Sequence, residues 1–162
     1  MYGLLEENCH PPSNTSGYDI VDKFRQAVET HGSIIHFKAY LDVSLSNGPK
    51  SAKLYSEFQD AGVTLAHCPH SGRKDVVDKM MLVDMISYTL YNSSPLTIVL
   101  ITGDRDFAYG ISSLRLRGYD VIVIVPPSAH NSIQTLGTFA LNWQSDVINA
   151  VVGTTRGLKC GE

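Results

Sequence analysis

The chain has 162 residues, of which 43% are hydrophobic and 18% are charged. That length and balance predict one globular domain with its own core and exclude a disordered chain. The formal net charge of −3 argues against a strong, self-sufficient electrostatic grip on nucleic acid, although it leaves room for a local basic patch.

Cysteine content and hydropathy predict the cellular compartment of the protein. The three cysteines, Cys9, Cys68 and Cys160, are odd in number and scattered, which favours free thiols in a reducing compartment. No apolar run has membrane-spanning length, and residues 1–5 lack the basic flank and hydrophobic segment of a signal peptide. We therefore expect an intracellular, cytoplasmic protein with no membrane partner.

Strand patterns and helix patterns alternate along the chain. Short runs rich in β-branched residues predict strands, and apolar residues at helical spacing predict helices. The expected strands are 1–5, 33–41, 63–66, 97–102, 119–125 and an edge strand within 136–143. The expected helices are 18–30, 50–61, 75–91 and 107–117, with a loop or short helix at 128–135. This alternation predicts a parallel α/β sheet with right-handed crossovers.

Residues 97–107, TIVLITGDRDF, combine a strand with two carboxylates. The run 97–102 has the composition of a strand that is buried on both faces, and Gly103 is expected to allow a tight turn after it. Asp104 and Asp106 then follow at the sheet edge where ligands gather in open parallel sheets. The alternative is that Asp104 only caps the helix or turn that comes next.

The longest helical pattern, 75–91, has apolar residues almost all round and is expected to be largely buried. It nevertheless contains Asp78 and Asp84, and a buried carboxylate needs a partner or a purpose because its burial is costly. For Asp84 we favour a hydrogen-bonded or rim position. For Asp78, which lies one turn from the helix start and near Arg73 and Lys74, we favour a functional role.

Polar side chains from distant segments are expected at one edge of the sheet. They are Glu6, Glu7 and Asn8 after the first strand, Asp78 on the long helix, and Asp104 and Asp106 after the central strand. Carboxylate clusters of this kind hold Mg²⁺ or Mn²⁺, which can activate water for attack on a phosphodiester. Spacing alone is a weak signal here, because two acids separated by one residue are common.

Basic and aromatic residues lie beside these acids in the sequence. Arg73, Lys74 and Arg105 are candidates for binding substrate phosphates, or for pairing with the aspartates. We expect Phe107 to pack under the sheet. The sequence has no glycine-rich nucleotide-binding pattern, which disfavours a nucleotide-cofactor fold.

Four segments carry a family resemblance. They are ENC with the following PP at 7–12, GRKDVVDK at 72–79, TGDRDF at 102–107, and LRLRGY with VPPS within 114–128. Together they resemble the NYN domain of the PIN-like nuclease superfamily, in its limkain-b1-like branch of the fungal type. The resemblance implies a three-layer α/β sandwich with a central, mainly parallel sheet of five to six strands over residues 1–152, followed by a tail or truncated boundary at 153–162.

The resemblance also implies an activity. The family is taken to hydrolyse RNA, expected to be single-stranded, with Mg²⁺ or Mn²⁺ held by carboxylates, and it leaves room for protein partners or a homodimer. Asp78, Asp104 and Asp106 match the family's acidic residues, and Asn8 matches its asparagine near the first strand.

One position departs from the family pattern. The family's first-strand aspartate falls on Leu5, which cannot bind a metal ion. Either Glu6 or Glu7 substitutes for it, or the site is weakened or dead, or the start of the sequence is truncated or mis-spliced. Two functions therefore stay open: a metal-dependent ribonuclease, and a catalytically lapsed NYN module that binds RNA or a protein.

Overall fold

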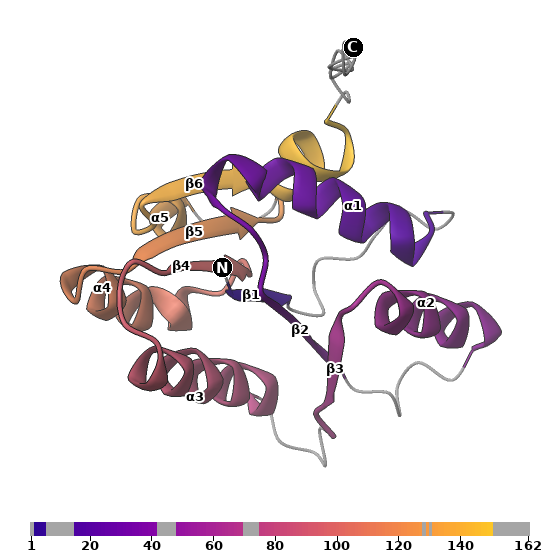
Figure 1. The fold of residues 1–162 in the computed structure, drawn as a ribbon, viewed down its shortest axis with the longest axis horizontal. Helices are drawn as coiled ribbons and strands as arrows, with labels where there is room; N and C mark the ends of the chain where they lie inside the picture. Colours follow the sequence, from indigo (N-terminus) through magenta and orange to yellow (C-terminus); the bar gives the residue numbers. More distant parts are fainter. Residues whose placement is uncertain are drawn as a thin grey trace, which may run out of the picture.

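A computed structural model describes residues 2–5, 15–41, 48–69, 75–127, 129 and 131–150. Its centre is a six-stranded sheet in the order β3-β2-β1-β4-β5-β6 (Figure 1). All neighbouring strands are parallel. The strands are β1 (Tyr2–Leu5), β2 (His36–Leu41), β3 (Thr64–His67), β4 (Thr97–Ile101), β5 (Asp120–Val125) and β6 (Phe139–Asn142).

Helices cover both faces of this sheet, so the domain has three layers (Figure 1). One face carries α1 (Gly17–Val28), α2 (Pro49–Asp60) and the π-helix η4 (Trp143–Ile148). The other face carries α3 (Val76–Tyr91), the 3-10 turn η3 (Arg105–Phe107), α4 (Ala108–Leu116) and the short α5 (Asn131–Gln134). A further 3-10 turn, η1 (Glu29–His31), follows α1. The predicted three-layer α/β fold around a parallel sheet is confirmed.

Strand β4 shows why the chain folds in this way. Its side chains alternate, with Ile98 and Leu100 packing in the core on the α3 and α4 side, and Val99 and Ile101 in the core on the α1 side. All four side chains are fully buried. A strand that is covered on both faces needs apolar residues at every position, which is the composition that predicted it.

The order of the strands creates a switch point in the sheet. The chain runs outward from β1 through β2 to β3, returns to place β4 beside β1, and then runs outward on the other side through β5 and β6. Leu5 at the end of β1 pairs with Ile101 at the end of β4. In open α/β sheets, ligands bind beyond the carboxyl ends of the strands at such a point.

The carboxyl-terminal part of the domain contains an element that the sequence did not predict. The π-helix η4 is an added element, which packs Trp143, Val147 and Ile148 into the core beside α1. The expected tail at 153–162 lies outside the described residues. In the described part of the chain, no helix combines the length and apolar character needed to cross a membrane.

The contact between α1 and α2 requires a glycine. The first residue of α1, Gly17, donates its backbone N–H to Glu57 Oε2 at 2.7 Å, and this hydrogen bond holds the pKa of Glu57 below its usual value. A Cβ atom at Gly17 would lie 2.8 Å from Glu57 Cβ and 3.1 Å from both Leu54 O and Phe58 N. The two helices therefore approach too closely for a side chain at this position.

We expect Gly17→Ala to lower the free energy of unfolding by about 1–3 kcal/mol, because the added methyl group forces α1 away from α2. Gly48→Ala is the matched control, since Gly48 also lies next to a helix start but a Cβ there meets nothing within 4 Å. Urea denaturation of both variants checks this. An equal effect at the two glycines would contradict the close-approach explanation.

Candidate active site at the carboxyl edge of the sheet

The chain leaves β4 through a turn that its own polar side chains hold. Thr102 is fully buried and continues the sheet by donating its backbone N–H to Ile124 O at 3.1 Å. Its hydroxyl Oγ1 accepts a hydrogen bond from the backbone N–H of Asp104 at 3.1 Å. The backbone of Asp104 is thereby fixed to the end of the central strand.

Asp104 is the N-cap of η3. Its Oδ1 accepts a hydrogen bond from the backbone N–H of Asp106 at 2.9 Å. The capping role that we considered as the alternative is therefore present, and it engages Oδ1 of the carboxylate. Asp104 is partly buried, whereas Arg105 and Asp106 are exposed. A cap of this kind holds the Asp104 carboxylate in one orientation at the edge of the sheet.

Gly103 is needed for space and not for a left-handed backbone conformation. Its φ lies outside the left-handed range that Gly32, Gly62 and Gly118 occupy. A Cβ atom at Gly103, however, would lie 3.0 Å from Pro126 Cγ and 3.3 Å from Ala129 Cβ. The end of β4 passes close to the segment that follows β5, and a side chain there would push the two apart.

Phe107 holds the acidic turn, which we define as residues 104–106, against the core of the domain. It is fully buried in the core on the α3 and α4 side, as predicted. The neighbouring Arg105 and Asp106 stay exposed, because the short 3-10 turn places one side chain in three against the sheet. The TGDRDF segment thus presents its charged residues outward from a fixed base.

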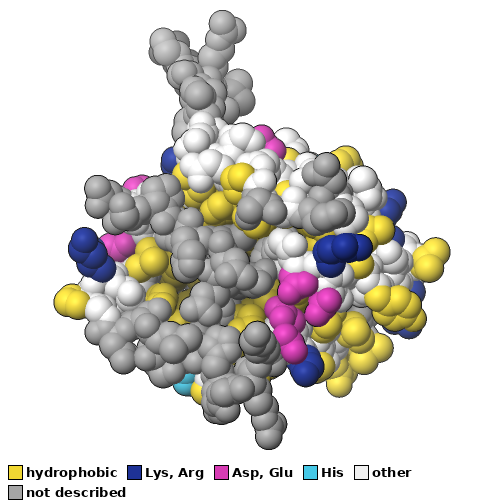
Figure 2. Space-filling view, turned by 180° about the vertical axis from the view of Figure 1, so that it is seen from behind, with side chains coloured by type: hydrophobic (Ala, Val, Ile, Leu, Met, Phe, Trp, Pro, Cys, Tyr) yellow, Lys and Arg dark blue, Asp and Glu magenta, His cyan; other side chains and the backbone are white. Residues whose placement is uncertain are grey.

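Asp78 comes to the same side of the sheet on another element. It lies in the first turn of α3, where the helix dipole favours a negative charge, and it is partly buried. Helix α3 contacts η3, the turn that carries Arg105 and Asp106. Figure 2 shows acidic side chains gathered on one face of the molecule, with Lys or Arg side chains at their margins.

The described residues alone do not complete a metal site. In this part of the chain, no three His, Cys, Asp or Glu side chains lie close enough together to hold a metal ion. Several predicted site residues lie outside the described residues, namely Glu6, Glu7, Asn8, Arg73 and Lys74. The donor chemistry of Asp104, Asp106 and Asp78 suits Mg²⁺ or Mn²⁺, but a joint metal site stays a prediction.

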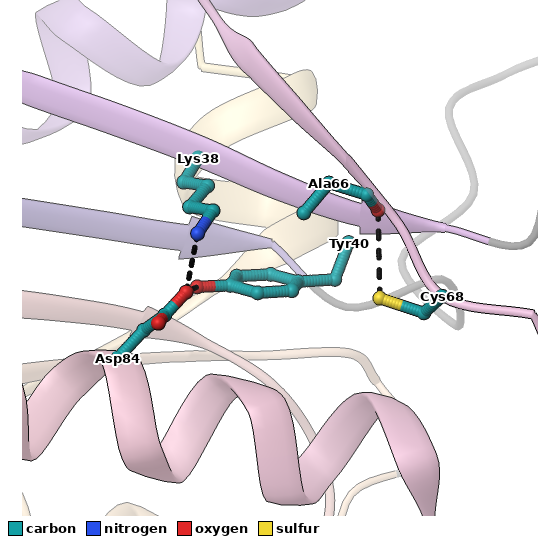
Figure 3. A network of polar contacts seen from close by, with 5 residues as sticks. All are labelled: Lys38, Tyr40, Ala66, Cys68 and Asp84. Carbon is teal, nitrogen blue, oxygen red and sulfur yellow. Dashed lines mark hydrogen bonds and ion pairs between the residues drawn. The ribbon is translucent and has the colours of Figure 1, made fainter.

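Asp84 has the structural role that its sequence context predicted. Lys38 and Tyr40, which both project from β2, point toward Asp84 on α3 (Figure 3). The Lys38 Nζ group pairs with Asp84 Oδ2, and the Tyr40 hydroxyl donates to the same oxygen at 2.6 Å. Burial raises the pKa of Asp84, but these hydrogen bonds and the Lys38 charge outweigh it and hold the pKa below its usual value. Tyr40 was not predicted as a partner, because nothing in a single sequence shows which strand faces a helix.

A testable pH dependence follows from this network. Because the pKa of Asp84 is lower in the folded protein, its stabilising contribution is present above about pH 3.8 and is lost as the pH falls through the folded pKa. We expect Asp84→Asn to lower the free energy of unfolding by about 0.5–1 kcal/mol at pH 7, a figure that allows for the partial exposure of the pair. The difference in this free energy between the variant and wild type is expected to shrink as the pH falls below about 3.8. Urea denaturation between pH 7 and pH 2.5 measures both.

The control for this prediction is Asp22→Asn, because Asp22 pairs with Arg25 at 2.6 Å on the exposed surface. An exposed pair of this type is expected to change stability by less than about 0.5 kcal/mol. If the free energies of unfolding of wild type and Asp84→Asn differ by the same amount down to pH 2.5, the charge of Asp84 does not contribute to stability.

Comparisons with known proteins agree with this geometry. A three-layer, all-parallel sheet with a switch point between β1 and β4 defines a doubly wound α/β domain, and this one carries acids beyond β4. A crystal structure of a protein of unknown function from Vibrio parahaemolyticus has the same fold, with a TM-score of 0.69, 18% identity, and coverage of 90% of this chain and 94% of that one. The family model of the NYN domain matches residues 6–138, and the chain belongs to this family.

Curated relatives point to the same family. Meiosis regulator and mRNA stability factor 1 from Mus musculus is 27% identical over 119 residues, which cover 73% of this chain and 7% of that protein. The proteins of the same name from Xenopus tropicalis and Gallus gallus are 27% and 26% identical over 119 residues. The match thus spans a small part of each of these relatives. As an NYN domain, the chain belongs to a PIN-like nuclease family.

Proposed function

We propose that this chain is a metal-dependent ribonuclease domain that hydrolyses phosphodiester bonds in RNA. The observation that carries the proposal is the pair Asp104 and Asp106, held by a cap and a buried phenylalanine at the switch-point edge of an NYN domain. Ligands of open α/β sheets bind at this edge, and two carboxylates there suit a divalent cation.

The proposed metal ligands come from three segments of the chain. Asp104 and Asp106 follow β4, Asp78 belongs to α3, and Glu6 or Glu7 stands in for the missing acid at Leu5. A bound Mg²⁺ or Mn²⁺ ion would activate water and offset the charge that develops on the phosphate. Asn8 is proposed to orient the substrate through its amide group.

The proposed substrate is single-stranded RNA. Arg105 is exposed next to Asp106 and can contact a phosphate, and Arg73 and Lys74 are proposed to do the same. These cations offset the negative charge of the acids, which would otherwise repel the substrate. The names of the curated relatives, which refer to mRNA stability, support an RNA substrate for this domain.

Metal removal tests the proposal. The chain is incubated with a fluorescent single-stranded RNA in Mn²⁺, in excess EDTA, and in EDTA followed by excess Mn²⁺. We expect cleavage in the first and third reactions and none in the second, because the carboxylates need the cation to act on the phosphate. Cleavage that persists in EDTA, or no cleavage in either Mn²⁺ or Mg²⁺, would contradict the proposal.

A second candidate function is a catalytically weakened NYN module that binds RNA or a protein partner. Leu5 favours it, because a leucine ends the strand that lies beside β4 at the switch point. Leu5→Asp separates the two functions. A gain of metal-dependent cleavage over wild type would support the lapsed module, and cleavage by wild type that the substitution does not increase would support the active enzyme.

A further inference from the structure

A cleft lies next to the two acids on the α4 side of the sheet. Its volume is about 650 Å³, which is in the range of sites that bind small organic ligands. Its lining residues are Arg105, Asp106 and Ala108 from η3 and α4, and Ser132, Thr135 and Leu136 from α5 and the turn after it. The cleft therefore extends from Asp106, one of the proposed metal ligands, to α5.

The wall formed by α5 is held by contacts that need no ligand. Ile133, which belongs to α5, is fully buried, and α5 contacts both β5 and η3. Arg115 Nη1 from α4 donates to Leu136 O at 2.8 Å, and Thr135 Oγ1 donates to Ser132 O at 3.0 Å. A cleft with a wall held in this way costs little ordering entropy when a ligand binds.

The chemistry of the lining selects one class of ligand. Apart from the Asp106 carboxylate, which is a proposed metal ligand, the polar side chains of the lining are one guanidinium and two hydroxyl groups. These are side-chain types that contact phosphates and sugars in nucleic-acid complexes. Ala108 and Leu136 add a small apolar surface. None of the lining residues that the structure describes is aromatic, so these residues offer no platform on which a base can stack. Such a lining fits the sugar–phosphate backbone and is indifferent to base identity.

We propose that this cleft seats the sugar–phosphate backbone of single-stranded RNA next to the cleaved phosphate. Arg105 contacts a phosphate, and the hydroxyls of Ser132 and Thr135 contact the sugar–phosphate chain on the other wall. The proposal rests on the proposed RNA substrate and adds a path for the strand, from Asp106 toward α5, that does not depend on the sequence of the RNA.

Binding measurements test this path. The chain and its variants are titrated into fluorescein-labelled U12 and A12 RNA in EDTA, which prevents metal-dependent cleavage, and fluorescence anisotropy gives the Kd. We expect Thr135→Glu to weaken binding of both RNAs by about fivefold or more, since a new carboxylate on an exposed wall repels the phosphates. We expect Arg105→Ala to weaken both equally and to reduce the slope of log Kd against log salt by about one.

The matched control is Ser56→Glu, which adds the same charge to an exposed serine of α2, on the opposite face of the sheet. It is expected to change Kd by less than about twofold. Thr135→Glu binding as tightly as Ser56→Glu, or no measurable RNA binding by wild type, would overturn the cleft proposal. If Thr135→Glu loses RNA binding but wild type shows no metal-dependent cleavage, the proposal that RNA binds in the cleft stands and the proposal that the chain is a ribonuclease is wrong.

Discussion

Replacing Asp104 by asparagine is expected to reduce metal-dependent RNA cleavage by about 100-fold or more while leaving the fold intact. Loss of a group that merely supports a metal ligand already costs roughly 10- to 100-fold, so loss of a ligand charge is expected to cost at least as much. The fold should survive because asparagine caps helices as well as aspartate does. Its amide oxygen can accept the hydrogen bond from the Asp106 N–H that Oδ1 of Asp104 accepts now.

The matched control for Asp104→Asn is Asp120→Asn. Asp120 is exposed at the first position of β5, which is the amino edge of the same sheet, so its loss removes an equal charge far from the proposed site. Initial rates of cleavage of one single-stranded RNA in Mn²⁺ measure both variants. Equal rates for the two, with matching circular dichroism spectra and melting temperatures, would exclude Asp104 as a metal ligand.

Phe107→Ala is expected to have the largest effect on stability, a loss of about 3–5 kcal/mol in the free energy of unfolding. Phe107 is fully buried among side chains of α3, α4, β4 and β5, and its removal leaves a cavity that this close-packed core cannot fill. The same cavity lies under η3. We therefore expect the residual folded protein to hold Asp104 and Asp106 less firmly and to cleave RNA more slowly.

Phe139→Ala is the control for this substitution, because Phe139 is 48% exposed on the edge strand β6. The same change of side chain there should cost less than about 2 kcal/mol, since less apolar area leaves water on folding. Guanidinium denaturation compares the two. A loss at Phe139 as large as the loss at Phe107 would contradict the prediction that burial in the core sets the cost at Phe107.

Much of the fold follows from local patterns in the sequence. The run at β4 is apolar at every position because both of its faces are covered, and this composition by itself predicts a central strand. Asp84 in an otherwise apolar helix predicts a polar partner, and Lys38 and Tyr40 are that partner. The position of Asp104 directly after the strand indicates a possible cap, and the structure shows that cap, with Asp106 exposed beside it.

Other features depend on contacts between segments that are far apart in the chain. The order of the strands, which places β1 beside β4, comes from crossovers over the whole sheet, and no local pattern encodes it. The π-helix after β6 is too short and mixed to show a period, and it forms because Trp143 and Val147 pack on α1. The need for glycine at position 103 reflects the distant Pro126.

The class of fold, the residues of the acidic turn and the hydrogen-bonded role of Asp84 follow from the amino-acid sequence, because hydrophobic period, capping and the cost of burying charge act over a few neighbouring residues. The neighbours of each strand, the side chains beside Gly103 and the cleft from Asp106 to α5 became visible in the folded chain alone. Those properties arise from packing between segments separated by many residues, which a local pattern of side chains does not specify.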